Sequence, residues 1–330
     1  MNKLNILVTG GSGFIASHLV DRLVSYGHFV VNLDKLDYCS YDNTKSIENK
    51  YKFIQGNICN KELVWFILNE YKINTIFHLA AQTHVDNSFY NSTQFTADNI
   101  VGTHNLLECT REYNDINKEN KIQKFIHMST DEVYGEIKEG ENECTELSLL
   151  KPTNPYSATK ASAELLASSY YHSFKLPIKI IRCNNVFGPR QYPEKVIPSF
   201  IYNLLNDQKC QIHGYGNTER HFIYVDNVID AIITISEKGN INEVYNIASN
   251  ECYKIKDLAK MLIKKIKNVD IKNDDDLENY VNYVEDRKFN DYRYLINSDK
   301  LEKLGWKNII NFEEGVNKTI EYFKNNNINY

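Results

Sequence analysis

Three polar side chains in the middle of the chain have the types and spacing of an acid–base site. Thr130, Asp131 and Glu132 stand together directly after the apolar run Lys124–Met128. A hydroxyl followed by two carboxyl groups can supply a hydrogen bond, a general acid and a general base, provided that the surroundings of the two carboxyls separate their pKa values. We expect an extended loop here, on which neighbouring side chains point different ways and the two acids reach different atoms.

A tyrosine and a lysine form a second candidate pair. Tyr156 and Lys160 are spaced i, i+4 in a helical stretch, so both side chains lie on one helix face. A lysine ammonium beside a phenol favours the phenolate, and we expect it to lower the tyrosine pKa from about 10 towards the working pH. Such a pair is common on protein surfaces, but its position before the sixth predicted strand of a nucleotide-binding sheet indicates a catalytic base and its assistant.

A glycine-rich turn near the N-terminus has the pattern of a dinucleotide site. The apolar run Asn5–Thr9 leads into Gly10 and Gly13, and a helical pattern begins at Phe14 and Ile15. Glycines let the backbone approach a pyrophosphate, and a helix N-terminus offers free N–H groups and the positive end of its dipole. Strand, turn and helix occur in the required order, which predicts that this turn binds NAD.

The end of the second predicted strand favours NAD over NADP. Asp34 lies about 20 residues beyond the turn, where a carboxylate can bind both ribose hydroxyls and repel a 2′-phosphate. Lys35 follows immediately, a cation that leaves NADP open as an alternative. Asn57 and Ile58, just after the third predicted strand, are expected near the adenine, although a polar loop residue is the alternative for Asn57.

These candidate residues need a sheet that brings them to one edge. Short apolar runs alternate with amphipathic stretches through the first half of the chain, which predicts an α/β fold: a doubly wound parallel Rossmann sheet with a smaller C-terminal α/β substrate-binding lobe. The NAD-binding domain is expected at 1–182 plus about 222–247, and the smaller substrate-binding lobe at about 183–221 plus 248–330. Predicted strands are Asn5–Thr9, Phe29–Leu33, Lys52–Ile54, Thr75–Leu79, Lys124–Met128 and Lys179–Arg182, and predicted helices lie near Phe14–Tyr26, Lys61–Glu70, Phe95–Tyr113 and Tyr156–Phe174.

Composition narrows the possible partners and compartments. The net charge is −5, with lysines scattered among acidic residues, so no nucleic-acid partner is predicted. The seven cysteines include no C-x-x-C pair, so we expect neither a disulfide framework nor a metal site. Without a signal-peptide pattern or an apolar run that could cross a bilayer, a cytoplasmic protein with no membrane partner is predicted.

Together these motifs resemble those of the extended short-chain dehydrogenase/reductases, and within them the nucleotide-sugar 4,6-dehydratases. The adjacent acids Asp131 and Glu132 discriminate best, because the related 4-epimerases share the glycine turn and the tyrosine–lysine helix but lack both acids together. Two departures are Ala16, in place of the third glycine, and Asn57, where the family commonly has Asp. The resemblance covers nearly the whole chain and includes His78–Ala81, Thr83–Asp86, Asn184–Pro189, Tyr192–Pro198, Arg220–Asp226, Asp286–Arg287 and Leu304–Trp306.

The resemblance implies a role for each matching residue. Tyr156, assisted by Lys160, would take the proton of the glucose 4-hydroxyl, to which Thr130 hydrogen-bonds, while the C4 hydride passes to NAD. Glu132 would take the C5 proton, and Asp131 would protonate the departing C6 hydroxyl. The resemblance also assigns Leu79, Ala80 and Ala81 to cofactor binding. To the binding of the nucleotide-diphosphate sugar it assigns His84, Asn185, Glu194, Lys195, His213, Arg220 and Arg287.

The resemblance favours UDP-glucose as substrate and UDP-4-keto-6-deoxy-glucose as product, the first step towards rhamnose or another 6-deoxyhexose. Gly13–His18, Leu33–Ser40 and Ala81–Ser88 are similar to the dehydratase domain of plant rhamnose synthases. His213 stands where dTDP enzymes usually carry a tyrosine against the thymine. The alternatives are a dTDP-glucose 4,6-dehydratase, then a UDP-sugar 4-epimerase, then a non-catalytic binder of NAD or nucleotide sugars.

The resemblance also implies a homodimer. Family members commonly pair through two helices, which correspond here to the stretches near Phe95–Tyr113 and Tyr156–Phe174. Four leucines on them suit either that interface or the core of a single chain: Leu106, Leu107, Leu165 and Leu166.

Overall fold

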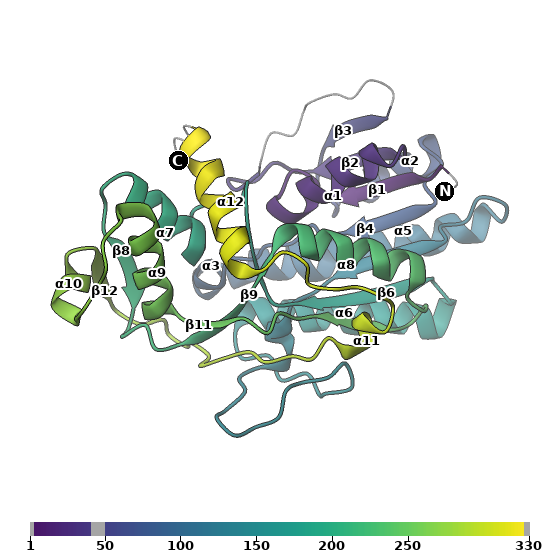
Figure 1. The fold of residues 1–330 in the computed structure, drawn as a ribbon. Coiled ribbons are helices and arrows are strands. Elements are labelled where there is room, and N and C mark those ends of the chain that lie inside the picture. Colours follow the sequence, from purple (N-terminus) through teal and green to yellow (C-terminus); the bar gives the residue numbers. More distant parts are fainter. Residues whose placement is uncertain (1–2, 41–49, 327–330) are drawn as a thin grey trace.

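The computed structural model describes residues 3–40 and 50–326, and its largest element is a seven-stranded sheet (Figure 1). Its strand order is β10-β6-β5-β4-β1-β2-β3, and every neighbouring pair is parallel. The predicted doubly wound sheet is therefore confirmed. Its strands are β1 (Asn5–Thr9), β2 (Phe29–Asp34), β3 (Tyr51–Gln55), β4 (Thr75–His78), β5 (Lys124–Met128), β6 (Ile178–Cys183) and β10 (Val244–Ile247).

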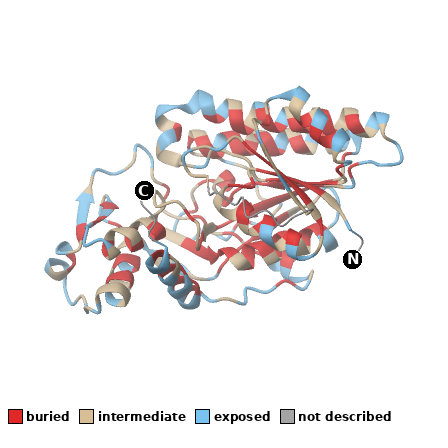
Figure 2. Cartoon of the chain, turned by 90° about the horizontal axis from the view of Figure 1, so that it is seen from above, coloured by how far each residue is buried: buried red, intermediate tan, exposed pale blue. Residues whose placement is uncertain are grey.

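Alternate side chains of the central strand β1 serve the two faces of the sheet. Ile6 and Val8 belong to one hydrophobic cluster and Leu7 to another, and all three are fully buried. Successive side chains of a strand point to opposite faces, so an unbroken apolar run is what a sheet covered on both sides requires. Figure 2 shows the buried residues concentrated in the sheet and on the helix faces turned towards it.

Two layers of helices cover the sheet. The contacts pair α1 with α8 in one layer, and α2 with α5 and α5 with α6 in the other. The bounds are α1 (Phe14–Ser25), α2 (Lys61–Glu70), α5 (Gly102–Ile116), α6 (Pro155–Phe174) and α8 (Val225–Lys238). Because each helix presents an apolar stripe to the sheet, burial of that stripe supplies most of its stability.

The elements predicted above are found with bounds shifted by no more than two residues, except the helix predicted at Phe95–Tyr113. In addition, the strand Val244–Ile247 was not predicted. The helix predicted at Phe95–Tyr113 is three segments: α4 (Ser92–Phe95), the π-helical turn η1 (Thr96–Val101) and then α5. A π turn inserts one extra residue per turn and is frequent at functional sites.

A smaller lobe lies beside one end of the large sheet, on the left in Figure 1. It contains a three-stranded sheet in the order β11-β9-β7 and the parallel pair β12-β8. Its elements are β7 (Asn185–Phe187), α7 (Val196–Leu205), β8 (Cys210–His213), β9 (Glu219–Tyr224), β11 (Cys252–Lys254), α9 (Ile255–Lys267), α10 (Asp274–Glu278), β12 (Val281–Val284) and α12 (Phe312–Asn325). The short helix α11 (Asp299–Glu302) instead contacts β10 of the large sheet. We keep the predicted domain boundaries as a proposal.

Aromatic side chains pack the lobe's strands against α12. Phe312 stacks on Tyr253 with ring centroids 4.3 Å apart and lies 5.0 Å from Phe187. Since β7, β11 and α12 are far apart in the sequence, this cluster ties three chain segments together. Aromatic pairs of this kind add about 0.5–1.5 kcal/mol each to their burial.

The order in which strands are added to the sheet reverses between β1 and β4. Strands β2 and β3 extend the sheet to one side of β1, and β4, β5, β6 and β10 extend it to the other. Ligands of open α/β sheets bind at the carboxyl ends of the strands beside such a switch point. Among the described residues no helix is both long and apolar enough to cross a membrane.

The leucines proposed for either the core or a dimer interface divide between inside and surface. Leu106 and Leu107 are fully buried in the core of the single chain, whereas Leu165 is 65% exposed on α6. Leu166 is partly buried against the core. Two of the four are therefore accounted for without a partner, and the homodimer stays a proposal.

Candidate active site

One cavity of about 500 Å³ lies at the carboxyl edge of the large sheet and reaches into the smaller lobe. Every residue predicted above for catalysis, cofactor or substrate lines it. These residues come from the ends of β1, β2, β3, β4 and β5 or the loops that follow them, from α6 and from the lobe. The fold therefore gathers into one site groups that the sequence spreads over more than half of the chain.

The glycine turn leaves open space where a phosphate needs it. Gly10 has φ +72°, and a Cβ on it would lie 2.7 Å from the Cα of Ala80, so only glycine fits. Helix α1 begins after Gly13 without a side-chain cap, which leaves its first N–H groups available to an anion. The turn and the helix end therefore fit the pyrophosphate of NAD.

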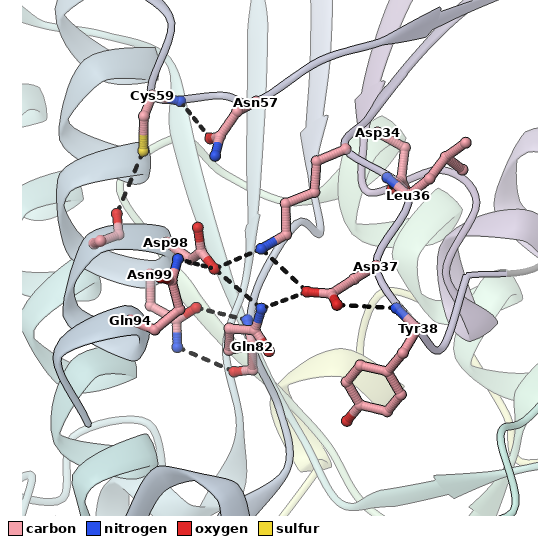
Figure 3. A network of polar contacts seen from close by, with 12 residues as sticks. Asp34, Leu36, Asp37, Tyr38, Asn57, Cys59, Gln82, Gln94, Asp98 and Asn99 are labelled. Atoms are coloured by element: carbon pink, nitrogen blue, oxygen red, sulfur yellow. Dashed lines mark hydrogen bonds and ion pairs between the residues drawn. The ribbon is translucent and has the colours of Figure 1, made fainter. Parts of the chain in front are cut away.

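Asp34 is held beside this turn by backbone N–H groups. Its Oδ2 accepts from the N–H of Ser12 (3.0 Å) and its Oδ1 from the N–H of Leu36 (2.8 Å). Asn57 lines the same end of the cavity, and its Oδ1 accepts from the N–H of Cys59 (2.8 Å) (Figure 3). An amide oxygen has two lone pairs, so Asn57 can still accept from an adenine amino group.

Asp131 and Glu132 lie in a short helix rather than the extended loop that we expected. Only Thr130 is extended, and Asp131–Tyr134 forms the 3-10 turn η2, because the Thr130 side chain accepts from the N–H of Glu132 and caps it. The two acids still face different partners. Asp131 Oδ2 accepts from Asn184 Nδ2 (2.8 Å), and Glu132 Oε2 accepts from Asn154 Nδ2 (3.0 Å).

The environments of the two acids raise both pKa values. Burial, with a smaller contribution from the charge of Glu132, raises the pKa of Asp131 to about 7, against the lowering effect of the Asn184 hydrogen bond. Burial also raises the pKa of Glu132, while the hydrogen bond from Asn154 and the charge of Lys195 oppose it. The raised pKa lets Asp131 carry a proton near neutral pH, as a general acid requires.

Tyr156 and Lys160 are both buried on α6, as their spacing predicts, but the expected lowering of the tyrosine pKa is not found. Burial, and then the charges of Glu132 and Asp131, raise the pKa of Tyr156. The Lys160 ammonium donates to the carbonyl oxygen of Met128 (2.5 Å), and burial lowers its pKa to about 8. The prediction failed because it considered the pair alone, without desolvation and the neighbouring acids.

The basic residues proposed for the diphosphate already have partners in the protein. Arg287 forms an ion pair with Asp86, whose carboxylate lies 2.9 Å from its Nε. Arg220 donates to Asn290 Oδ1 (3.0 Å), and its guanidinium lies over the ring of Tyr294. These contacts hold both guanidinium groups at the wall of the cavity.

Two further residues that the family resemblance assigns to substrate binding contact loops around the cavity. Lys195 donates to the carbonyl oxygen of Thr83 (2.9 Å), and Glu194 accepts from the hydroxyl of Tyr38 (2.6 Å). Both contacts join the smaller lobe to loops that follow strands of the large sheet.

The other three residues that the resemblance assigns to substrate binding have different surroundings. His84 caps the short helix α3 (Val85–Tyr90). The Asn185 Nδ2 is buried and has no hydrogen-bond partner among the described residues, so it can donate to a ligand. His213 is exposed at the end of β8, and its Nδ1 lies 3.2 Å from the carbonyl oxygen of Glu285.

Sequence reasoning assigned no role to the partners that orient the site. Asn154 and Asn184 hold the two acids, Asp86 holds Arg287, and Asp98 contacts the lysine beside Asp34. The signal was present for the two asparagines, which are neighbours of Tyr156 and Asn185 inside the same motifs. Asp86 likewise ends the matching stretch Thr83–Asp86, whereas the contact of Asp98 joins distant segments and no local pattern marks it.

The fold, the glycine turn and the paired acids define an NAD-dependent short-chain dehydrogenase/reductase that acts on a nucleotide sugar. A family profile described as GDP-mannose 4,6 dehydratase matches residues 7–319, and the chain belongs to this family. It is a nucleotide-sugar 4,6-dehydratase, and the predicted resemblance and cofactor are confirmed.

Three known proteins illustrate the similarity. The chain is 45% identical to the human dTDP-D-glucose 4,6-dehydratase, covering 97% of this chain and 90% of that protein. It is 46% identical to an Arabidopsis thaliana trifunctional protein named UDP-glucose 4,6-dehydratase/UDP-4-keto-6-deoxy-D-glucose 3,5-epimerase/UDP-4-keto-L-rhamnose-reductase, covering 98% of this chain and 47% of that protein. A Streptomyces venezuelae dTDP-glucose 4,6-dehydratase solved with NAD superposes with a TM-score of 0.88, at 31% identity and 97% coverage of both chains.

Proposed function

We propose that the protein converts UDP-glucose to UDP-4-keto-6-deoxy-glucose. The observation that carries this proposal is the pair of acids at the cavity, with Asp131 held by Asn184 and Glu132 held by Asn154. Loss of water across C5 and C6 needs one group that removes a proton and another that delivers one. A 4-epimerase has no step that needs these two groups, so their presence supports the dehydratase.

The first step is oxidation at C4 of the sugar. Tyr156 accepts the proton of the 4-hydroxyl, and the Thr130 hydroxyl hydrogen-bonds the C4 oxygen. NAD, when bound, supplies the positively charged ring that accepts the C4 hydride and later returns it to C6. Because the charges of Glu132 and Asp131 raise the pKa of Tyr156, protonation of Asp131, the proposed acid, favours the phenolate.

The second step is elimination. The 4-ketone acidifies the C5 proton, which Glu132 removes as the C6–oxygen bond breaks. Asp131 delivers its proton to the departing oxygen, which leaves as water, and Glu132 returns its proton to C5 when C6 is reduced. Proton and leaving group are thus handled by two carboxyls whose hydrogen-bond partners keep them apart, Asn154 at the start of α6 and Asn184 just after β6.

The smaller lobe would hold the nucleoside diphosphate. Arg220 and Arg287 line the cavity, and guanidinium groups suit bidentate contact with phosphate oxygens. Lys195 adds a third cation at the wall. Binding of the diphosphate requires Arg287 to exchange or share its ion pair with Asp86.

The preference for uracil rests on His213 and on the similarity to the plant enzyme. His213 lies on the cavity wall at the end of β8. The alternative, dTDP-glucose, is supported by the names of the animal relatives, so the substrate test must compare both nucleotides. A thymine differs from uracil by one methyl group, which is worth about 0.8 kcal/mol when buried, or about fourfold in kcat/KM.

The test incubates the purified protein with UDP-glucose and, separately, with dTDP-glucose, and follows the products by mass spectrometry. Loss of one water from the UDP sugar at the higher kcat/KM supports the proposal. A higher kcat/KM with the dTDP sugar overturns the uracil preference, and an unchanged mass with galactose formed overturns the dehydratase. His213→Tyr should shift the ratio towards dTDP-glucose several-fold.

A matched pair of variants tests the acids. Glu132→Gln should lower the rate of water loss by about 100-fold or more, because an amide cannot accept the C5 proton. Glu139→Gln removes an exposed carboxylate from the same loop region and should leave the rate unchanged. Full activity of Glu132→Gln would contradict the assignment.

A further inference from the structure

The lysine beside Asp34 is held between two carboxylates. The Lys35 ammonium lies 2.8 Å from Asp98 Oδ2 and 3.1 Å from Asp37 Oδ2 (Figure 3). The Asp98 side chain is only 8% exposed, whereas that of Lys35 is 34% exposed. Although burial lowers it, the hydrogen bonds that the ammonium donates to Asp98 and Asp37 raise the pKa of Lys35 overall, so the ammonium stays charged.

Two glutamines fix the position of the Asp98 carboxylate. Its Oδ2 accepts from Gln82 Nε2 and Gln94 Nε2, each at 3.0 Å. Gln82 also donates to Asp37 Oδ2 (2.7 Å), so one amide joins both carboxylates (Figure 3). Asp98 itself stands on the π-helical turn η1. The lysine therefore faces a rigid acceptor rather than a mobile surface side chain.

The negative charge around this end of the cavity disfavours the 2′-phosphate that distinguishes NADP from NAD. Asp34, Asp37 and Asp98 all line the cavity beside Lys35, and Asp37 and Asp98 form ion pairs with it. NADP differs from NAD by a 2′-phosphate on the adenosine ribose, and a basic side chain near the end of the second strand is what accommodates that phosphate. Lys35 is placed to do this, but its ammonium is committed to Asp98 and Asp37.

We propose that Asp98 is a specificity-determining residue, which holds Lys35 away from the adenosine ribose and thereby makes the enzyme reject NADP. This inference rests on the proposed contact of Asp34 with the ribose hydroxyls and is independent of which sugar nucleotide is the substrate. Selectivity here comes from two carboxylates: Asp34 contacts the ribose, and Asp98 neutralises Lys35, a neighbouring cation that could bind the extra phosphate.

The test measures which nucleotide the full-length chain retains. Each variant is equilibrated with equal NAD and NADP, freed of unbound nucleotide by rapid gel filtration and denatured, and the released nucleotides are separated by chromatography. Asp98→Asn should raise the ratio of bound NADP to NAD at least tenfold over wild type. The double variant Asp98→Asn with Lys35→Met should return the ratio to within twofold of wild type, and Glu62→Gln, an exposed carboxylate at the start of α2, should not change it.

Two outcomes would overturn the inference. One is an unchanged ratio in Asp98→Asn; the other is an equal rise with and without Lys35, which would show a general effect of charge. Should Asp98→Asn fail to fold, Asp37→Asn removes the more exposed partner, and its smaller rise must again vanish with Lys35→Met. Asp34→Ala is the separate control: if it leaves NAD retention unchanged, the ribose assignment fails rather than the role of Asp98.

Discussion

Replacing Asn184 tests how the protein sets the pKa of its proposed general acid. Asn184 donates from Nδ2 to Asp131 Oδ2 (2.8 Å), and its Oδ1 accepts from the backbone N–H of Ser249 (2.9 Å). The second contact fixes the amide so that its donor, not its acceptor, faces the acid. Asn184→Ala removes this donor and leaves Asp131 buried beside Glu132.

The size of the effect follows from the contact that is lost. A hydrogen bond to a charged acceptor contributes about 1.5–3 kcal/mol, and one pKa unit corresponds to about 1.4 kcal/mol, so the loss of this bond raises the pKa of Asp131 by about 1–2 units. Thr130, which also hydrogen-bonds Asp131, and the Arg220 charge both remain and limit the rise. From its value of about 7, the pKa moves to about 8–9.

The direction in which activity changes with pH follows from the role of Asp131 as a proton donor. Water loss needs the protonated acid, so activity falls as the pH rises through this pKa, and the alkaline limb of kcat/KM should move upwards by about 1–2 pH units in Asn184→Ala. The limb reports the titration of the coupled pair of Asp131 and Glu132. Asn184→Ser, whose hydroxyl can still donate, should restore part of the shift.

The assay is the pH dependence of kcat/KM for water loss, with thermal melting of each variant as the control for folding. A merely structural role of Asn184 would lower activity at every pH and leave the limb in place. That result, or a limb displaced to lower pH in a folded variant, would refute the assignment of Asp131 as the acid.

Three further changes test the fold and the cofactor site. Arg182→Ala leaves the buried carboxylate of Glu164 without its partner at 2.7 Å, and urea unfolding should show a loss of about 3–5 kcal/mol. Burial keeps His127 neutral in the folded chain by lowering its pKa well below 6.5, whereas the unfolded chain binds a proton below that value. Stability should therefore fall by up to about 1.4 kcal/mol per pH unit below pH 6.5 for this residue, and His127→Phe should remove that part of the slope in urea titrations at pH 7 and 5. Gly10→Ala places a Cβ 2.7 Å from Ala80 Cα at φ +72°, so NAD retention measured by gel filtration should drop at least tenfold.

The large sheet could be read from the sequence because its signal is local. The buried strand Asn5–Thr9 has three apolar residues in a row and is followed closely by a helical period. Val244–Ile247 was not predicted, because it joins the sheet beside β6 through a parallel pairing to residues far back in the chain, a contact that no local pattern marks. The π turn at Thr96–Val101 was also invisible, because the hydrophobic period of the stretch is helical on both sides of it.

The residues of the site could be predicted from the sequence, but their pKa values could not. Tyr156 and Lys160 could be paired from spacing, because the helix fixes the geometry of i, i+4 neighbours. The pKa of Tyr156 depends instead on burial and on Glu132, which a loop from another strand brings beside it. A pattern of residues along one segment contains no information on desolvation by other segments.

Contacts between distant segments also explain why Asn154 both caps a helix and holds an acid of the site. Asn154 begins α6: its Oδ1 accepts from the N–H of Ser157 (2.8 Å), a helix cap that contributes about 1 kcal/mol. Its Nδ2 donates to Glu132 (3.0 Å). Because Tyr156 is the second residue of that helix, the residue that starts the helix also positions the proposed C5 base relative to the proposed C4 base. An aspartate could cap the helix equally well but has no donor for Glu132, so the choice of asparagine follows from the site rather than from the helix.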